Sequence, residues 1–255
     1  MTSFETGPLY VGVSTKMYLG YAQSLAWLEQ LVKEVDARPA LAAGRVVPFV
    51  IPSFPVLPAA LELVADSPLV LGAQDCGWED GPWTGEVSPS MLAEIGVRLV
   101  EIGHAERRQW FAESEAMIAR KVRAAVDSGL TPLLCVGEPE TVSPQAAADF
   151  VLGQIDEAVS GDWALAGKLA IAYEPVWAIG AAEPASSEYV SDVVSRLRRL
   201  LGRHGLAQLP VIYGGSAKPG LLPQLIGVSG LFLGRFAHDP ANFGRVLDEA
   251  LALPN

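Results

Sequence analysis

The chain is poor in cysteine and has no long apolar run. Two cysteines in 255 residues are too few for the disulfide framework of small secreted domains. No apolar run approaches the roughly 18 residues that a membrane span needs. The N-terminus also lacks the basic and apolar regions of a signal peptide. We therefore expect a cytoplasmic protein without a membrane segment.

Basic residues are scarce as well. The sequence has 18 Lys and Arg against 29 Asp and Glu, which gives a net charge of −11. Nucleic acid is bound mainly through clustered Lys and Arg, so we expect no nucleic-acid partner. An anionic substrate would have to be captured by local cations, backbone amides and helix N-termini rather than by the overall field.

Half of the residues are hydrophobic, and the length suits one α/β barrel domain over residues 1–255. Eight apolar segments bounded by turn signals predict strands at Leu9–Ser14, Val46–Ile51, Leu69–Ala73, Leu99–Ile102, Pro132–Val136, Leu169–Tyr173, Pro210–Tyr213 and Gly230–Leu233. Helical periodicity is clearest at Leu25–Val35, Glu113–Ser128, Pro144–Val159, Ser187–Leu201 and Pro240–Leu251. This alternation predicts eight parallel strands in a closed (β/α)8 barrel.

The segment AIAYEPVWAIG, residues 170–180, joins a predicted strand to a Glu-Pro turn. In parallel barrels, residues at the carboxyl ends of strands carry the chemistry, so Glu174 is a candidate general base. An exposed glutamate before a turn is the plainer interpretation. The residues that follow it suit a rigid flap with flexible ends; this candidate lid comprises Pro175, Val176, Trp177, Ala178, Ile179, Gly180, Ala181 and Ala182.

Two more candidates stand at strand ends. Lys16 follows the first strand, and His104 follows the fourth after Gly103. A solvated lysine and a structural histidine are the ordinary alternatives. Because His104 opens a helix-like segment, the positive end of that helix would keep its ring neutral near pH 7.

Glycine-rich turns follow the last two strands. Gly214-Gly215-Ser216 ends the seventh, and Gly234-Arg235 follows the eighth. Barrels often bind phosphate between these two loops, although such turns are also common without a ligand.

The motifs together resemble the triosephosphate isomerase family over nearly the whole chain. They are TKM (15–17), GAQD (72–75), WTGEVSPSML (83–92), EIGHAERR (101–108), KVRAAVDSGLTPLLCVGE (121–138), YEPVWAIG (173–180), YGGSAKP (213–219) and GLFLGR (230–235). This resemblance implies an isomerase that passes through a cis-enediolate and needs neither a metal nor an organic cofactor.

The resemblance also implies roles for individual residues. Glu174 is similar to the family's base and His104 to its neutral electrophile. Lys16 is similar to the lysine that stabilises negative charge, and Glu106 to the carboxylate that positions that lysine. The residues that correspond to the substrate and phosphate contacts are Ser14, Lys16, Gly180, Ser216, Gly234 and Arg235.

Further matches concern assembly and packing. The loop Trp78–Glu86 resembles the one that a second subunit receives, which implies a homodimer with Thr84 at the interface. Cys135 lies in an apolar setting that favours packing over nucleophilic chemistry. Arg107 and Arg108 are expected to form structural ion pairs near the site.

The sequence departs from the family pattern at three places. Ser14 replaces an asparagine that contacts substrate, Ala105 replaces a serine, and Arg235 replaces the second glycine of the phosphate cup. Ser14 and Gly234-Arg235, with Val50-Ile51-Pro52 and Pro184-Ala185-Ser186, resemble the erythrulose-phosphate isomerase branch of the family.

A smaller Ser14 would leave room for the extra hydroxymethyl group of a four-carbon ketose phosphate. The reaction expected first is therefore the interconversion of L-erythrulose 1-phosphate and D-erythrulose 4-phosphate. A triosephosphate isomerase remains the alternative, because pockets separate one-carbon homologues by only about 1–3 kcal/mol. An inactive barrel that binds a sugar phosphate is a third possibility, because fold alone does not give function.

Overall fold

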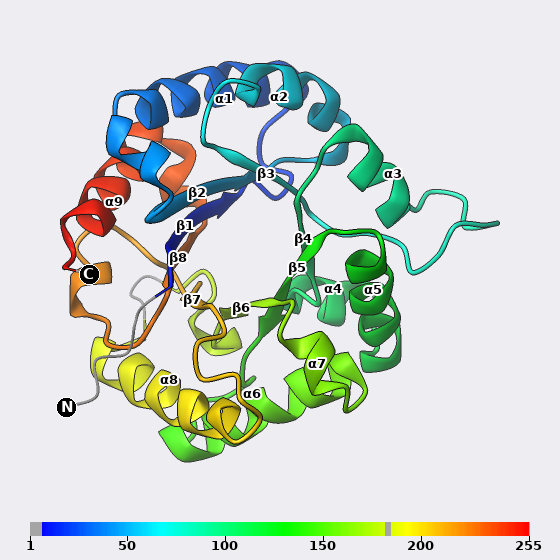
Figure 1. The fold of residues 1–255 in the computed structure, drawn as a ribbon, viewed down its shortest axis with the longest axis vertical. Coiled ribbons are helices and arrows are strands. Elements are labelled where there is room, and N and C mark those ends of the chain that lie inside the picture. Colours follow the sequence, from blue (N-terminus) through cyan, green and yellow to red (C-terminus); the bar gives the residue numbers. More distant parts are fainter. Residues whose placement is uncertain (1–6, 182–184, 255) are drawn as a thin grey trace.

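The computed structural model describes residues 7–181 and 185–254. Eight parallel strands close into a barrel in the order of the sequence, with helices around it (Figure 1). The strands are β1 (Leu9–Ser14), β2 (Val46–Ile51), β3 (Val70–Ala73), β4 (Leu99–Ile102), β5 (Thr131–Val136), β6 (Ala170–Tyr173), β7 (Val211–Tyr213) and β8 (Gly230–Leu233). The predicted (β/α)8 barrel is thus confirmed, with strand bounds that differ by at most one residue.

The α-helices are α1 (Tyr21–Asp36), α2 (Leu57–Val64), α3 (Pro89–Ile95), α4 (Ala105–Trp110), α5 (Glu115–Asp127), α6 (Pro144–Val159), α7 (Trp163–Ala166), α8 (Ser187–Gly202) and α9 (Pro240–Ala252). Short 3₁₀ turns are η1 (Pro39–Ala43), η2 (Phe54–Val56), η3 (Val176–Ala178), η4 (Leu222–Gln224) and η5 (Arg235–His238). Among the described residues, no helix has the length and apolar character to cross a bilayer.

Two predicted helix starts need correction. Helix α1 begins at Tyr21, four residues before the apolar pattern starts, because the Gln23 side chain accepts a hydrogen bond from the Gly20 amide (3.1 Å) and caps a polar first turn. Helix α5 begins two residues later than predicted, because the Ser114 hydroxyl caps it by accepting from the Met117 amide. Glu113 consequently lies before the helix.

The apolar side chains form two packed regions. The larger one fills the space between the strands and the surrounding helices. The smaller one fills the barrel interior with Phe49, Ile51, Leu99, Leu133, Cys135, Ala170, Ala172, Ile212 and Phe232. The rings of Phe49 and Phe232 stack there with centroids 5.7 Å apart. The barrel interior is therefore a packed core rather than a channel.

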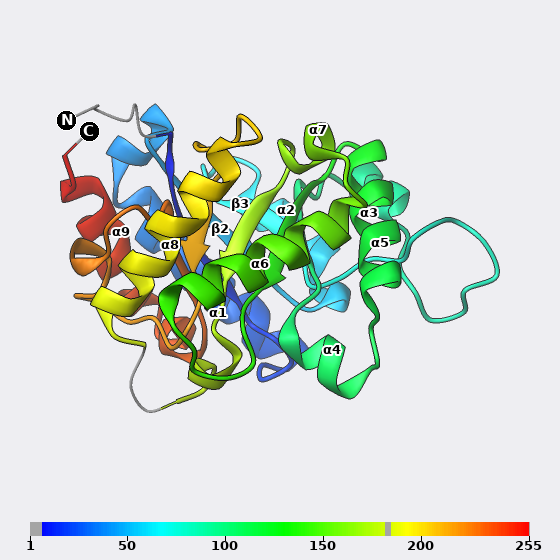
Figure 2. The ribbon, with the colours of Figure 1, turned by 90° about the horizontal axis from the view of Figure 1, so that it is seen from below.

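Loops at the carboxyl ends of the strands lie on the side shown at the bottom of Figure 2, where α4 and the segment after β6 are found. A long loop between β3 and α3 projects away from the barrel in both views. It contains the segment Trp78–Glu86, in which the rings of Trp78 and Trp83 meet edge to face at 4.9 Å.

Candidate active site

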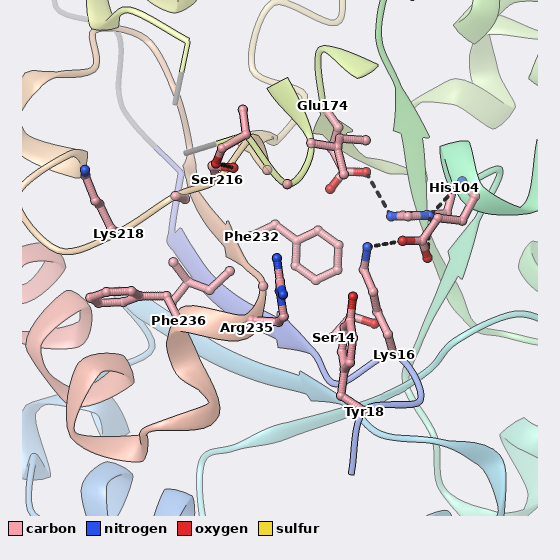
Figure 3. Close-up of a pocket in the computed structure, with 18 of the residues that line it drawn as sticks. Ser14, Lys16, Tyr18, His104, Glu174, Ser216, Lys218, Phe232, Arg235 and Phe236 are labelled. Carbon is pink, nitrogen blue, oxygen red and sulfur yellow. Dashed lines mark hydrogen bonds and ion pairs between the residues drawn. The ribbon is translucent and has the colours of Figure 1, made fainter. Parts of the chain in front are cut away.

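A cavity of about 690 Å³ opens at the carboxyl ends of the strands (Figure 3). It brings together residues that are far apart in the sequence. Its walls include every residue proposed above for catalysis or phosphate binding: Ser14, Lys16, His104, Glu106, Glu174, Gly180, Ser216, Gly234 and Arg235. Of the predicted lid, Ile179, Gly180 and Ala181 line the cavity, whereas Ala182, like Pro184, lies outside the described residues.

Glu174 follows β6 and is buried, with 6% of its surface exposed. Its Oε2 atom lies 3.7 Å from Nε2 of His104. A β-carbon on Gly214 would come within 2.4 Å of Oε1 of Glu174, so any larger residue at this position would displace the carboxyl. Burial raises the pKa of Glu174 to about 7, although the cation of Lys16 opposes the shift.

His104 is the N-cap of α4, and its Nδ1 accepts a hydrogen bond from the Glu106 amide at 3.1 Å. The ring proton of the neutral imidazole is therefore on Nε2, which faces Glu174. Burial is the main cause that lowers the pKa of His104, to about 4, and the charge of Lys16 adds to it. The direction of this shift agrees with the predicted neutral ring, and burial is its largest cause.

Lys16 has a left-handed backbone conformation, with φ at 48°. Its carbonyl accepts hydrogen bonds from the Ser53 hydroxyl (2.9 Å) and the Gln74 amide group (2.7 Å), which hold this unfavourable conformation. Its Nζ atom donates to Oε1 of Glu106 at 2.6 Å. Burial alone would lower the pKa of Lys16, but the contact with Glu106 raises it. The ammonium is therefore charged and aimed into the cavity (Figure 3).

The opposite end of the cavity carries the two glycine-rich turns. The Ser216 hydroxyl hydrogen-bonds the carbonyls of Ala178 and Ala181, both at 3.0 Å, and so ties the turn after β7 to the lid. The Arg235 side chain points into the cavity (Figure 3). Its guanidinium lies over the ring of Tyr18, with 5.6 Å from Cζ to the ring centroid. The guanidinium of Arg235 therefore adds a cation to this end of the site, at a position where the family pattern has glycine.

One carboxylate anchors the start of the lid. Glu138, just after β5, accepts hydrogen bonds from the Tyr173 hydroxyl (3.2 Å), the Trp177 indole (3.0 Å) and the Tyr189 hydroxyl (2.9 Å). These donors come from β6, η3 and α8.

A buried ion cluster lies beside the site. Lys121 is 1% exposed and contacts Asp75, with 2.8 Å from Nζ to Oδ2, and Glu113. Arg107 pairs with the same carboxylates at 2.8 and 3.2 Å, and Arg108 pairs with Glu115. Burial raises the pKa of Asp75 to about 6 against the opposing charge of Lys121. The expected ion pairs of both arginines are thus present.

The structure adds cavity residues that the sequence analysis did not propose. These are Tyr18, Glu101, Ala217, Lys218, Phe232, Leu233 and Phe236. For Glu101 a signal was available, because it is the only charged residue of the strand Leu99–Ile102. Cys135 and Cys76 are free and buried, and burial raises the pKa of both thiols, in line with packing rather than nucleophilic chemistry.

Comparisons with known proteins agree with this geometry. The family model described as triosephosphate isomerase matches residues 9–250. The chain is 48% identical over 250 residues to the L-erythrulose-1-phosphate isomerase of Pectobacterium atrosepticum, with 96% of each chain covered. It is 36% identical over 251 residues to the triosephosphate isomerase of a Synechococcus strain, covering 96% of this chain and 98% of the relative.

A solved structure has the same architecture. The triosephosphate isomerase of Bartonella henselae superposes with a TM-score of 0.75 at 28% identity, covering 94% of this chain and 98% of that one. Together with the cavity at the strand ends, these matches establish that the chain is an isomerase and belongs to the triosephosphate isomerase family.

Proposed function

We propose that the chain interconverts L-erythrulose 1-phosphate and D-erythrulose 4-phosphate. The observation that carries the proposal is the close approach of Glu174 to His104 in a cavity that has a small Ser14 beside the reacting groups. Serine leaves space where an asparagine would crowd the carbon that carries the extra hydroxymethyl group. The similarity to the Pectobacterium enzyme supports the same substrate.

The proton transfers follow from the positions of three side chains. Glu174 removes the proton from carbon 3 of L-erythrulose 1-phosphate, and Nε2–H of His104 donates toward the carbonyl oxygen on carbon 2. The resulting enediolate spans carbons 2 and 3, and its charge is stabilised by Lys16, which Glu106 positions. His104 gives its Nε2 proton to the oxygen on carbon 2 and takes up the proton of the hydroxyl on carbon 3. Return of the first proton from Glu174 to carbon 2 then leaves a hydroxyl on carbon 2 and the carbonyl on carbon 3.

The phosphate group belongs at the other end of the cavity. We assign it to the backbone amides around Gly180, Ser216, Gly234 and Arg235, which line that end, because backbone N–H groups are effective anion ligands. The Arg235 guanidinium adds a cation there. Closure of the lid would exclude water from the enediolate.

The test compares two substrates. We expect kcat/KM of the purified protein to be at least about 10-fold higher on L-erythrulose 1-phosphate than on dihydroxyacetone phosphate, the range that one additional carbon can supply. Ser14→Asn should reduce that ratio, whereas Ser160→Asn, the same exchange at an exposed position outside the cavity, should not. A preference for the triose would favour triosephosphate isomerase, the activity named for the Synechococcus relative. Turnover of neither would favour an inactive sugar-phosphate-binding barrel.

We also propose that the protein is a cytoplasmic homodimer formed through the loop Trp78–Glu86. The loop projects from the barrel (Figures 1 and 2), and Trp83 within it is 38% exposed. A projecting aromatic loop can bury apolar surface against a second copy.

Sedimentation equilibrium tests this interface. Thr84→Arg is expected to convert a dimer into a monomer, because it adds a bulky charge to the proposed contact, whereas Thr141→Arg, at another exposed loop threonine, should leave the mass unchanged. A monomeric wild type, or a dimeric Thr84→Arg variant, would contradict the proposal.

A further inference from the structure

Glu101 is a buried carboxyl without a part in the proton transfers above. It lies on β4, is 4% exposed and lines the cavity. Its neighbours on the inside of the barrel are apolar, including Leu133, its partner in the register of β5, and Cys135, whose Sγ is 4.0 Å from Oε1 of Glu101. Placing a carboxyl in such surroundings costs free energy unless it gains hydrogen bonds.

The polar neighbours of Glu101 are all part of the site. Ser14 lines the same cavity, its hydroxyl opposes the rise in the pKa of Glu101, and Nε2 of His104 is 4.0 Å from Oε1 of Glu101. Burial, followed by the charge of Glu174, raises the pKa of Glu101 to about 8. The carboxyl is therefore mostly protonated at neutral pH, and can both accept and donate a hydrogen bond.

The arrangement of the four groups on carbon 3 directs the hydroxymethyl group of the substrate toward Ser14 and Glu101. Carbon 3 of L-erythrulose 1-phosphate carries a hydrogen, a hydroxyl, the hydroxymethyl group and carbon 2. The hydrogen must face Glu174, and the hydroxyl must lie near Nε2 of His104. Carbon 2 leads to the phosphate, which is assigned above to the end of the cavity near Ser216 and Arg235, both labelled in Figure 3. The hydroxymethyl group is left to face the remaining wall, beside Ser14 and Glu101.

One distance is compatible with this placement. Because Oε1 of Glu101 is 4.0 Å from Nε2 of His104, the Glu101 carboxyl borders the region where a substrate oxygen would accept a hydrogen bond from that nitrogen. A triose has only a hydrogen in this direction and leaves the carboxyl without a partner from the substrate.

We infer that Glu101, together with Ser14, binds the hydroxyl on the fourth carbon of the substrate and so selects tetrulose phosphates over triose phosphates. This inference rests on the proposed function. It assigns Glu101 as a specificity-determining residue that contacts the substrate outside the bonds that change.

The experiment measures kcat/KM of three enzymes on each of three substrates. The enzymes are the wild type, Glu101→Leu and Glu101→Gln. The substrates are L-erythrulose 1-phosphate, its 4-deoxy analogue with a methyl group in place of the hydroxymethyl, and dihydroxyacetone phosphate. Glu101→Leu should lower kcat/KM on the tetrulose by about 10–100-fold, the loss expected for one buried hydrogen bond. Its kcat/KM on the other two substrates should change by no more than a few-fold.

Two further comparisons keep the test independent of folding. Glu101→Gln preserves the size and a hydrogen-bonding end, so it should restore much of the tetrulose activity. Leu133→Met changes the facing residue of β5, which does not line the cavity, and should leave all three activities unaltered. The wild type alone should prefer the tetrulose to its 4-deoxy analogue by a similar factor.

Each contrary outcome has a distinct meaning. An equal loss on all three substrates would place the effect of Glu101 on His104 or on the fold, and would overturn the inference. Equal wild-type activity on the tetrulose and the 4-deoxy analogue would overturn it as well. A wild type that converts only the triose would overturn the proposed function itself, whatever the variants do.

Discussion

Glu174→Gln is expected to lower kcat on L-erythrulose 1-phosphate by about 10²–10⁴-fold, the contribution of a positioned general base. The amide is nearly isosteric but cannot accept the proton of carbon 3. Affinity for phosphate should stay within a few-fold, because the phosphate is assigned to backbone amides at the other end of the cavity. The measurements are kcat and the inhibition constant of inorganic phosphate.

The pH dependence provides the control for this assignment. A base must be ionised, and the pKa of Glu174 is raised to about 7, so wild-type kcat/KM should fall as the pH drops through 7 and level off above it. The residual activity of Glu174→Gln should lack this acidic limb. Glu140→Gln, the same exchange at an exposed residue outside the cavity, should retain both rate and profile. Near wild-type turnover by Glu174→Gln would remove the residue from the role of base.

Lys121→Met is expected to lower the free energy of unfolding by about 3–5 kcal/mol, because it removes one of the two cations that pair with the buried carboxylates of Asp75 and Glu113. Methionine has a similar length, so a packing defect contributes little. Urea unfolding of the wild type and the variant measures the difference. Arg107 still contacts both carboxylates, which limits the loss.

Arg123→Met, on the same helix, is the matched control. Arg123 pairs with Asp162 at 2.7 Å, but both side chains are about half exposed, and exposed pairs contribute about 0–1 kcal/mol. Adding Asp75→Asn and Glu113→Gln to Lys121→Met should recover part of the lost stability, because the uncompensated charges are removed. Equal losses for Lys121→Met and Arg123→Met would show that burial does not decide the contribution of these pairs.

The barrel could be predicted from the sequence, because each buried strand is a short apolar run between turn residues. Lys16, His104 and Glu174 were recognisable because they stand where such runs end. Nothing in the spacing of these residues gives the 3.7 Å between Glu174 and His104, which exists only once the barrel has closed.

Buried charges were harder to predict. Lys121 resembles the solvated lysine of an amphipathic helix, and only the fold reveals that it meets Asp75, 46 positions earlier in the chain. Glu101 interrupts an apolar strand, but the side of the strand that it occupies follows from the register with β5. The Arg235 guanidinium lies over the ring of Tyr18, which comes from the opposite end of the chain, and the sequence does not indicate this contact.

Because three donors converge on Glu138, the two ends of the proposed lid are held with different strength. Trp177 is clamped to a charged acceptor that also holds β6 and α8, so displacing it would break a charge-assisted hydrogen bond. By contrast, the Ala181 carbonyl accepts a hydrogen bond from the neutral hydroxyl of Ser216. In the lid that we propose, the end next to Glu174 is therefore held more strongly than the end near the proposed phosphate site. Closure of that lid would move its outer end over the substrate while Glu174 keeps its position.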